Sequence, residues 1–294
     1  MRVKRVTFPG IGVPALLLAP QLAITFVFFV WPSIQSLRSS LFRQDAFGTS
    51  EEFAGLGNFI KLFAEPDYGY AFGLTLFFAA ATTALSMGFA LLFAVLTEGV
   101  VKGASIYKSL LIWPYAVAPA IAGVLWWFLF NPTIGIFSRA LSAIGIDWNH
   151  YLNSGQALAL VIIASAWKQL SYNFLFFLAG LQTIPKSLLE AASLDGADGF
   201  MRFRTVVFPL LMPTTFFLIV TNLVYAFCDT FAVIHATTGG GPGTATTTLI
   251  FKIYRDGFES LDLGSSAAQS VILMFLVGSL TIIQFRYIER NIHY

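Results

Sequence analysis

Six stretches of about 20 mostly apolar residues occur along this chain, and they restrict its possible folds more than any other feature. Each stretch is long enough to cross a bilayer as a helix. The alternating polarity of a membrane β-strand is missing from all of them. The pattern therefore predicts an all-α integral membrane protein. Its six transmembrane helices are expected at residues 11–32, 71–96, 107–130, 157–181, 209–234 and 267–285.

The composition also favours a membrane protein. Hydrophobic residues make up 57% of the chain and charged residues only 11%, whereas soluble domains carry about 25% charged residues. So few charges could not cover a water-exposed surface. The net charge of +2 does not favour binding to nucleic acid. The single cysteine, Cys228, excludes an intrachain disulfide and is typical of a small buried hydrophobic residue.

The distribution of lysine and arginine predicts the orientation. Nine of these residues fall in the two termini and in the loops 98–106 and 182–208, which six spans place on one side, and a tenth, Lys108, lies at the same end of the third span. Six fall in the longer loops of the opposite side. Because cytoplasmic loops are enriched in positive charge, the segments 1–10 and 286–294 are predicted to be cytoplasmic. Residues 33–70 are then a periplasmic loop.

Motifs typical of enzymes are missing from the sequence. It contains no G-x-x-x-x-G-K-[ST], so the chain does not bind ATP through a P-loop. It also lacks G-x-S-x-G, H-E-x-x-H and paired catalytic carboxylates, and its three histidines lack metal-ligand spacing. We therefore expect no catalytic residue and no metal site. A channel, a transporter or a membrane scaffold fits better than an enzyme.

The most polar interruption between spans is residues 187–213, SLLEAASLDGADGFMRFRTVVFPLLMP. Ser187 and Glu190 match a capping box, which marks the start of a helix. Gly196 is suited to end that helix in a left-handed conformation. The pattern predicts a cytoplasmic helix of about two turns, roughly 12 Å long. It is either a capped connector or, because Leu188 and Leu189 expose apolar surface, a docking element for a partner protein.

Part of this segment, EAASLDGADGFMRFRTVVFP, resembles a known motif. It is similar to the E-A-A-x-x-x-G-x(9)-I-x-L-P cytoplasmic loop of permeases from binding-protein-dependent ABC importers. Val206 stands where the motif has Ile, and Phe208 where it has Leu, so both positions stay apolar. The matching positions are Glu190, Ala191, Ala192, Gly196 and Pro209.

The resemblance implies a type I ABC importer permease in the cell inner membrane, with residues 71–285 as the five-helix transport domain. Its coupling loop, residues 186–209 with Asp195 and Ala197 among the motif positions, would dock on a separate ATPase. No cofactor is then expected on this chain, because ATP and Mg belong to the ATPase. The implied partners are a second, similar permease, an ABC ATPase dimer, a periplasmic or lipid-anchored solute-binding protein, and membrane lipid.

Other segments resemble the carbohydrate-uptake branch of these importers. The Gly/Thr-rich segment TTGGGPGTATT is by itself a turn outside the membrane. The resemblance implies that its residues Gly239, Gly240, Gly241 and Pro242 form a periplasmic docking loop. The stretch LLIWPYAVAPAIAGVLWWFLFNPTIG looks most like permeases of sn-glycerol-3-phosphate importers. That likeness implies this solute, with glycerophosphodiesters as further candidates, whereas a neutral sugar or oligosaccharide is the alternative.

Charged residues inside spans are costly and are candidates for function. Lys168 would assist a phosphate in transit, or it makes a structural ion pair or extends to the interface. For Asp229, helix capping or pairing with a cation is favoured, because a free carboxylate repels an anion. An ion-coupled secondary transporter with these two residues as a relay is the second alternative function, and a scaffold the third. The candidate pathway residues are Lys168, Tyr172, Asn173, Asn222, Tyr225 and Asp229.

Overall fold

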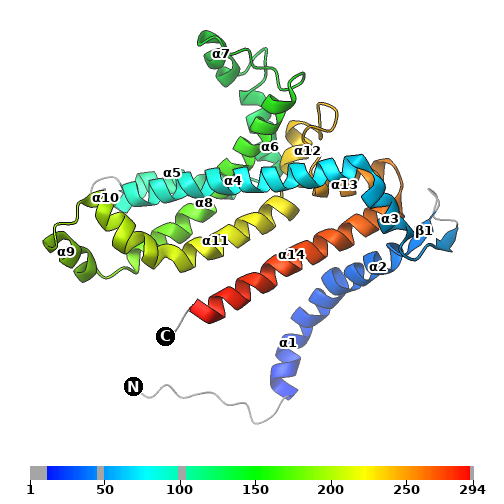
Figure 1. The fold of residues 1–294 in the computed structure, drawn as a ribbon, viewed down its shortest axis with the longest axis horizontal. Helices are drawn as coiled ribbons and strands as arrows, with labels where there is room; N and C mark the ends of the chain where they lie inside the picture. The colour runs from blue at the N-terminus through cyan, green and yellow to red at the C-terminus, as the bar shows by residue number, and fades with distance from the viewer. Residues whose placement is uncertain (1–11, 45–49, 99–103, 292–294) are drawn as a thin grey trace. The chain divides into compact units, whose positions relative to one another are not determined.

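The computed structural model describes residues 12–44, 50–98 and 104–291, which are mostly helical (Figure 1). The predicted cytoplasmic segment 1–10 lies outside the described residues, as do the last three residues of 286–294. Among the described residues, five helices are long and apolar enough to cross a membrane, and a bent pair of helices is a sixth candidate. The prediction of an all-α membrane protein is confirmed. The five helices are Gly12–Ser39, Pro66–Thr97, Ser154–Gln182, Gly199–Cys228 and Leu263–Arg286.

The third predicted span, residues 107–130, is not one straight helix. The structure divides it into α5 (Ala104–Ala116) and α6 (Pro119–Leu129), which are bent by 106°. The cause is local, because Pro114 lacks the N–H that would continue the hydrogen-bond ladder. In addition, Ala118 precedes Pro119 and takes an extended conformation, φ −60° and ψ 142°.

The fifth predicted span, 209–234, also has different ends. The helix begins near Gly199 as α10 (Gly199–Arg202), continues through the π-helical turn Phe203–Val207, and becomes α11 (Phe208–Cys228). Pro209 lies in the first turn of α11, where its missing N–H is tolerated. The chain then starts a separate helix, α12 (Phe231–Thr237).

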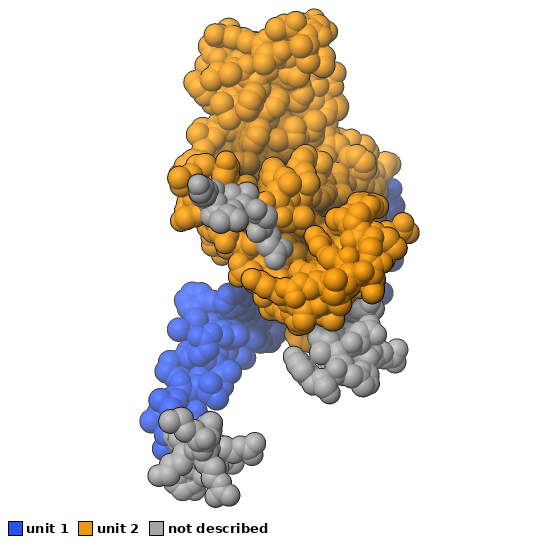
Figure 2. All heavy atoms as spheres, turned by 90° about the vertical axis from the view of Figure 1, so that its left-hand side faces the viewer, with its two compact units in different colours: residues 1–64, 253–272 blue, residues 65–252, 273–294 orange. Residues whose placement is uncertain are grey.

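The chain divides into two compact units, coloured separately in Figure 2. The first contains residues 1–64 and 253–272. Its described elements begin with α1 (Gly12–Thr25), a π-helical turn (Phe26–Val30) and α2 (Trp31–Ser39), which form one long apolar helix. They continue with strands β1 (Phe42–Gln44) and β2 (Glu51–Phe53), helix α3 (Gly57–Ala64), the π-helical turn Arg255–Glu259 and the start of α14 (Leu263–Asn291).

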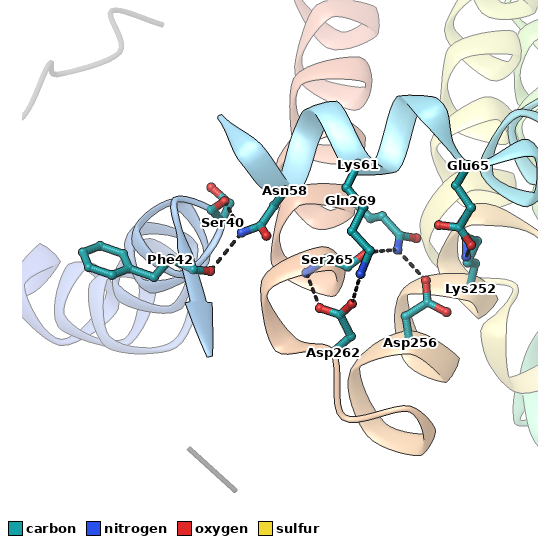
Figure 3. A network of polar contacts seen from close by, with 10 residues as sticks. All are labelled: Ser40, Phe42, Asn58, Lys61, Glu65, Lys252, Asp256, Asp262, Ser265 and Gln269. Carbon is teal, nitrogen blue, oxygen red and sulfur yellow. Dashed lines mark hydrogen bonds and ion pairs between the residues drawn. The ribbon is translucent and has the colours of Figure 1, made fainter. Parts of the chain in front are cut away.

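Polar contacts hold this first unit together (Figure 3). The antiparallel strands pair Arg43 with Glu52. The buried Asn58 amide of α3 donates to the carbonyls of Ser40 and Phe42, each at 2.9 Å. Lys61 of the same helix forms a 2.9 Å ion pair with Asp262, just before α14. These contacts join strand β1, helix α3 and the start of α14 to one another.

The second unit contains residues 65–252 and 273–294. Its centre is formed by α4 (Pro66–Glu98), α8 (Ser154–Gln182) and α11, which pack side by side. Large apolar side chains such as Phe174, Phe177 and Leu218 are fully buried between them. The remaining described elements are α7 (Ile136–Ala143), α9 (Lys186–Leu194), α13 (Leu249–Tyr254) and those given above. Figure 1 shows α9 and α10 at one end of the central helices.

Candidate functional site

Helix α9 is the short helix expected in the coupling loop, but it starts differently from the prediction. The capping-box prediction is wrong, because the N-cap residue is Pro185 and no side chain caps the helix. Ser187 instead lies within the first turn. The end of the helix is as predicted: Gly196 has φ +81°, and the amide of Ala197 donates to the carbonyl of Ala192 at 3.0 Å.

A second short helix supports α9. Asp198 caps α10 by accepting a 2.7 Å hydrogen bond from the amide of Met201. Arg202, at the end of α10, donates to the hydroxyl of Ser193 on α9 at 2.8 Å. The two helices are therefore joined by side chains at positions that the motif does not specify. This hydrogen bond helps to hold α9 in its position relative to α10.

One motif residue, Glu190, lies at an open pocket of about 800 Å³. Glu190 lines it with Leu189 and Arg202, and Glu190 is exposed. Leu194 is 89% exposed, and Phe200 and Met201 are also exposed. An exposed apolar rim beside a carboxylate and a guanidinium is suited to contact with another protein. Of the other motif positions, Ala191, Asp195, Gly196 and Pro209 are exposed, and Ala192 and Ala197 are half-buried.

Two of the candidate pathway residues form a buried cluster with a third residue. Asn173 of α8 and Asn222 of α11 are 0% and 1% exposed. Each donates from its amide nitrogen to the other's carbonyl oxygen, at 3.0 and 2.6 Å. Ser86 of α4 bonds to both, at 3.1 Å each. In this structure the three side chains therefore join the three central helices to one another and do not line an open path.

Lys168 and Tyr172, one turn apart on α8, lie beside the bend between α5 and α6. The Lys168 ammonium donates to the carbonyl of Val117 at 2.6 Å and contacts the carbonyl of Tyr115 at 3.4 Å. Tyr172 stacks on Tyr115 with ring centroids 6.5 Å apart. Both side chains are half-buried. Among the described ion pairs, none includes Lys168.

The remaining two candidates differ in their surroundings. Tyr225 is 9% exposed and lies on the buried face of α11, one turn beyond Asn222. Asp229 is exposed at the C-terminal end of α11, and its amide donates to the carbonyl of Tyr225 at 2.8 Å. The structure thus brings Asn173 and Asn222 together and Lys168 and Tyr172 together, but it does not join the six residues into one site.

The predicted docking loop is tightly hydrogen-bonded to itself. The hydroxyl of Thr246 donates to the carbonyl of Gly241 at 3.0 Å and accepts a 2.7 Å hydrogen bond from the hydroxyl of Thr238. Thr247 donates to the carbonyl of Gly240 at 3.1 Å. Gly240 is required here, because its φ is +84° and a Cβ would lie 2.5 Å from the ring of Phe251. Gly239 is exposed, whereas Gly241 and Pro242 are half-buried.

Several residues of these clusters were not found from the sequence. Ser86 and Ser193 are single serines without a local pattern, and only their partners give them a role. The run of threonines after the glycines was a visible signal, because closely spaced hydroxyls can satisfy the carbonyls of a turn. No group of three or more His, Cys, Asp or Glu residues that could hold a metal occurs in the described parts of the chain.

The arrangement of a helical membrane core with an exposed short helix agrees with comparisons to known proteins. The family described as "Binding-protein-dependent transport system inner membrane component" matches residues 3–294. The chain belongs to this family. It is a multi-pass inner-membrane permease subunit of the ABC importer class and not an enzyme.

Individual relatives cover the chain from end to end. The sn-glycerol-3-phosphate transport system permease protein UgpA of Brucella suis is 55% identical over 292 residues, which are 99% of this chain and all of that protein. The protein of the same name from Yersinia pseudotuberculosis is 56% identical over 294 residues, all of both chains. A bacterial ABC transporter that imports the acidic polysaccharide alginate has the same fold. Its TM-score is 0.81 at 20% identity, with 96% of each chain covered.

Proposed function

We propose that this chain forms half of the translocation pathway of an importer for sn-glycerol-3-phosphate. The observation that carries the proposal is the 55–56% identity, over 99–100% of this chain, to permease proteins named for that solute. Because the alignment covers the whole chain, it includes the central helices, the coupling loop 186–209 and the predicted docking loop. Glycerophosphodiesters, which share the phosphate and glycerol groups, are further candidate solutes.

We also propose that the chain works in a complex. The family description, a component of a binding-protein-dependent transport system, supports a solute-binding protein as one partner. The described chain contains an exposed α9 beside an open pocket, which suits docking of an ATPase that carries ATP and Mg. A second, similar permease would supply the other half of the pathway. In this assembly, closure of the ATPases moves α9, and α9 transmits the movement to the central helices through α8 and α11, which flank it in the chain.

The test is uptake by the reconstituted complex. Proteoliposomes would contain this chain, its partner permease and the ATPase, with ATP inside the compartment that faces α9 and binding protein on the other side. We expect uptake of radiolabelled sn-glycerol-3-phosphate that requires ATP and is inhibited by the unlabelled compound, whereas maltose does not compete.

The alternatives give different results in the same assay. Competition by maltose but not by sn-glycerol-3-phosphate would favour a neutral-sugar importer and contradict the proposed solute. Uptake by the chain alone, driven by an ion gradient without ATP, would contradict the importer itself. A glycerophosphodiester added as a third competitor tests the range of solutes.

A further inference from the structure

The bend between α5 and α6 leaves backbone groups without helical partners. Pro114 and Pro119 both lack an N–H, and the 106° change of direction ends the regular ladder at Ala116. The carbonyls at the end of a helix have no partner within it. Inside a membrane no water replaces that partner, so irregular backbone occurs there only where protein groups satisfy it.

Lys168 satisfies two of these carbonyls from the neighbouring helix. Its ammonium lies 2.6 Å from the carbonyl oxygen of Val117 and 3.4 Å from that of Tyr115. It also lies 5.9 Å from the centre of the Tyr115 ring, a distance that allows a cation–π contact. A positive charge at this place is favourable in a further way, because the C-terminal end of a helix carries partial negative charge.

Neighbouring aromatic residues of α8 contact both sides of the same bend. The ring of Trp167 lies 6.3 Å from Trp113 of α5 and 5.9 Å from Trp126 of α6, in edge-on geometry in both cases. One turn further along, Tyr172 stacks on Tyr115. A single stretch of α8 therefore touches the end of α5, the turn and α6.

We propose that Lys168 is a positioning residue that stabilises the bend between α5 and α6, and is not a ligand for the anionic group of the solute. Two of its three donors already face backbone carbonyls, and its neighbours on α8 brace the same bend. In transporters with interrupted helices, such carbonyls coordinate a coupling cation. Here a fixed ammonium takes that position, so the geometry also disfavours coupling to an ion at this place.

The direct test measures the bend and does not depend on which solute is carried. Spin labels would be attached at Leu110 on α5 and Phe128 on α6, both exposed, in a background where the only cysteine is replaced by Cys228→Ala. Pulsed electron resonance on the assembled complex gives the distance distribution between the labels. We expect Lys168→Met to broaden or shift this distribution and Lys168→Arg, which keeps the charge and donors, to preserve it.

Uptake kinetics separate positioning from solute binding. For Lys168→Met we expect the maximal rate to fall by about tenfold or more, as for loss of a charged hydrogen bond, with a change in KM of less than about threefold. Lys168→Gln keeps N–H donors without the charge and is the second variant if Lys168→Met does not reach the membrane. An unchanged distance distribution in the neutral variants would overturn the proposal, and a raised KM alone would assign Lys168 to the solute.

Discussion

Asn222 lies where α4, α8 and α11 meet, and its side chain is fully used by protein groups. Its amide nitrogen donates to Asn173 and to the carbonyl of Leu218, and its oxygen accepts from Asn173 and Ser86. Buried polar groups in a membrane join helices because they have no water to bond instead. At the scale of single residues, this cluster acts as a structural contact between helices.

Replacing Asn222 with Leu should destabilise the protein by about 1 kcal/mol, the usual size of an interhelical hydrogen bond in a membrane. The cost arises because Asn173 and Ser86 then lose a shared partner in a buried place. Thermal unfolding of the purified protein in detergent measures the effect. Thr215→Ala is the matched control, since the described hydrogen bond of the Thr215 hydroxyl goes to the carbonyl of Leu211 within its own helix. Equal stability of the two variants would contradict this role.

His150 gives a prediction about pH. It is 1% exposed in the loop before α8. Burial lowers the pKa of His150 below its usual value of about 6.5, and the nearby backbone of Phe130 only partly opposes this. The folded protein thus holds the neutral form, so its stabilisation is complete above pH ~6.5 and is lost as the pH falls from there towards the folded-state pKa.

The unfolding temperature should therefore decrease between pH 7.5 and pH 5.5. His150→Asn should remove part of this decrease, because asparagine does not take up a proton. Ser138→Ala, which changes a buried side chain that does not titrate, is the control and should keep the slope of the native protein. If both variants show the native slope, another group causes the dependence on pH.

At the scale of elements, α6 is held by two neighbouring helices. The ring of its Trp126 contacts Trp167 of α8, and α6 also packs closely against α12. Gly123 makes this approach possible, because a Cβ there would lie 2.8 Å from the Cβ of Ala236 and 3.0 Å from the carbonyl of Val233. Such contacts leave no room for a larger residue without movement of a helix.

Gly123→Ala should therefore destabilise the protein by about 1–3 kcal/mol, the usual cost of overpacking. The same substitution at Gly88 of α4 is the control, since a Cβ there meets nothing within 4 Å. Alanine has the higher helix propensity, so Gly88→Ala should be neutral or slightly stabilising. Thermal unfolding of both variants decides, and similar losses in the two would show that packing at Gly123 is not the cause.

At the scale of the whole molecule, the spans differ in how far the chain itself covers them. In the apolar 18-residue window that defines each span, 56% of Ser154–Gln182 is buried within the protein, whereas none of Gly12–Ser39 is. The central helix α8 is thus mostly surrounded by this chain, whereas the first span presents its apolar side chains outward. Outside the spans, the exposed surface around α9 carries the link proposed between this chain and an ATPase.

Glu190→Lys should uncouple ATP hydrolysis from uptake in the reconstituted complex. The change reverses an exposed charge beside the pocket, so folding should be unaffected while docking is weakened. We expect uptake to fall by about tenfold or more, as for truncation of a central interface contact, with normal amounts of protein in the membrane. Glu259→Lys changes an exposed carboxylate elsewhere by the same charge and should keep uptake. Undiminished uptake in Glu190→Lys would contradict the coupling role.

The sequence by itself determined the helical nature of the apolar segments, because a bilayer demands about 20 apolar residues per helix. It also determined the end of α9, since only a residue without a Cβ takes the conformation of Gly196 freely. The capping box failed because a local pattern of two residues competes with the preceding Pro185, which sets the start of the helix.

Only the tertiary structure decided how distant polar residues are paired. Ser86, Asn173 and Asn222 lie on three helices, and Lys168 meets carbonyls about 50 positions earlier in the chain. No local pattern encodes such contacts, because they depend on the rotation and bending of whole helices. An apolar stretch of sufficient length therefore indicates a membrane helix, and its prolines can bend that helix locally. Which distant side chains meet the backbone at the bend is decided only by the packing of the helices.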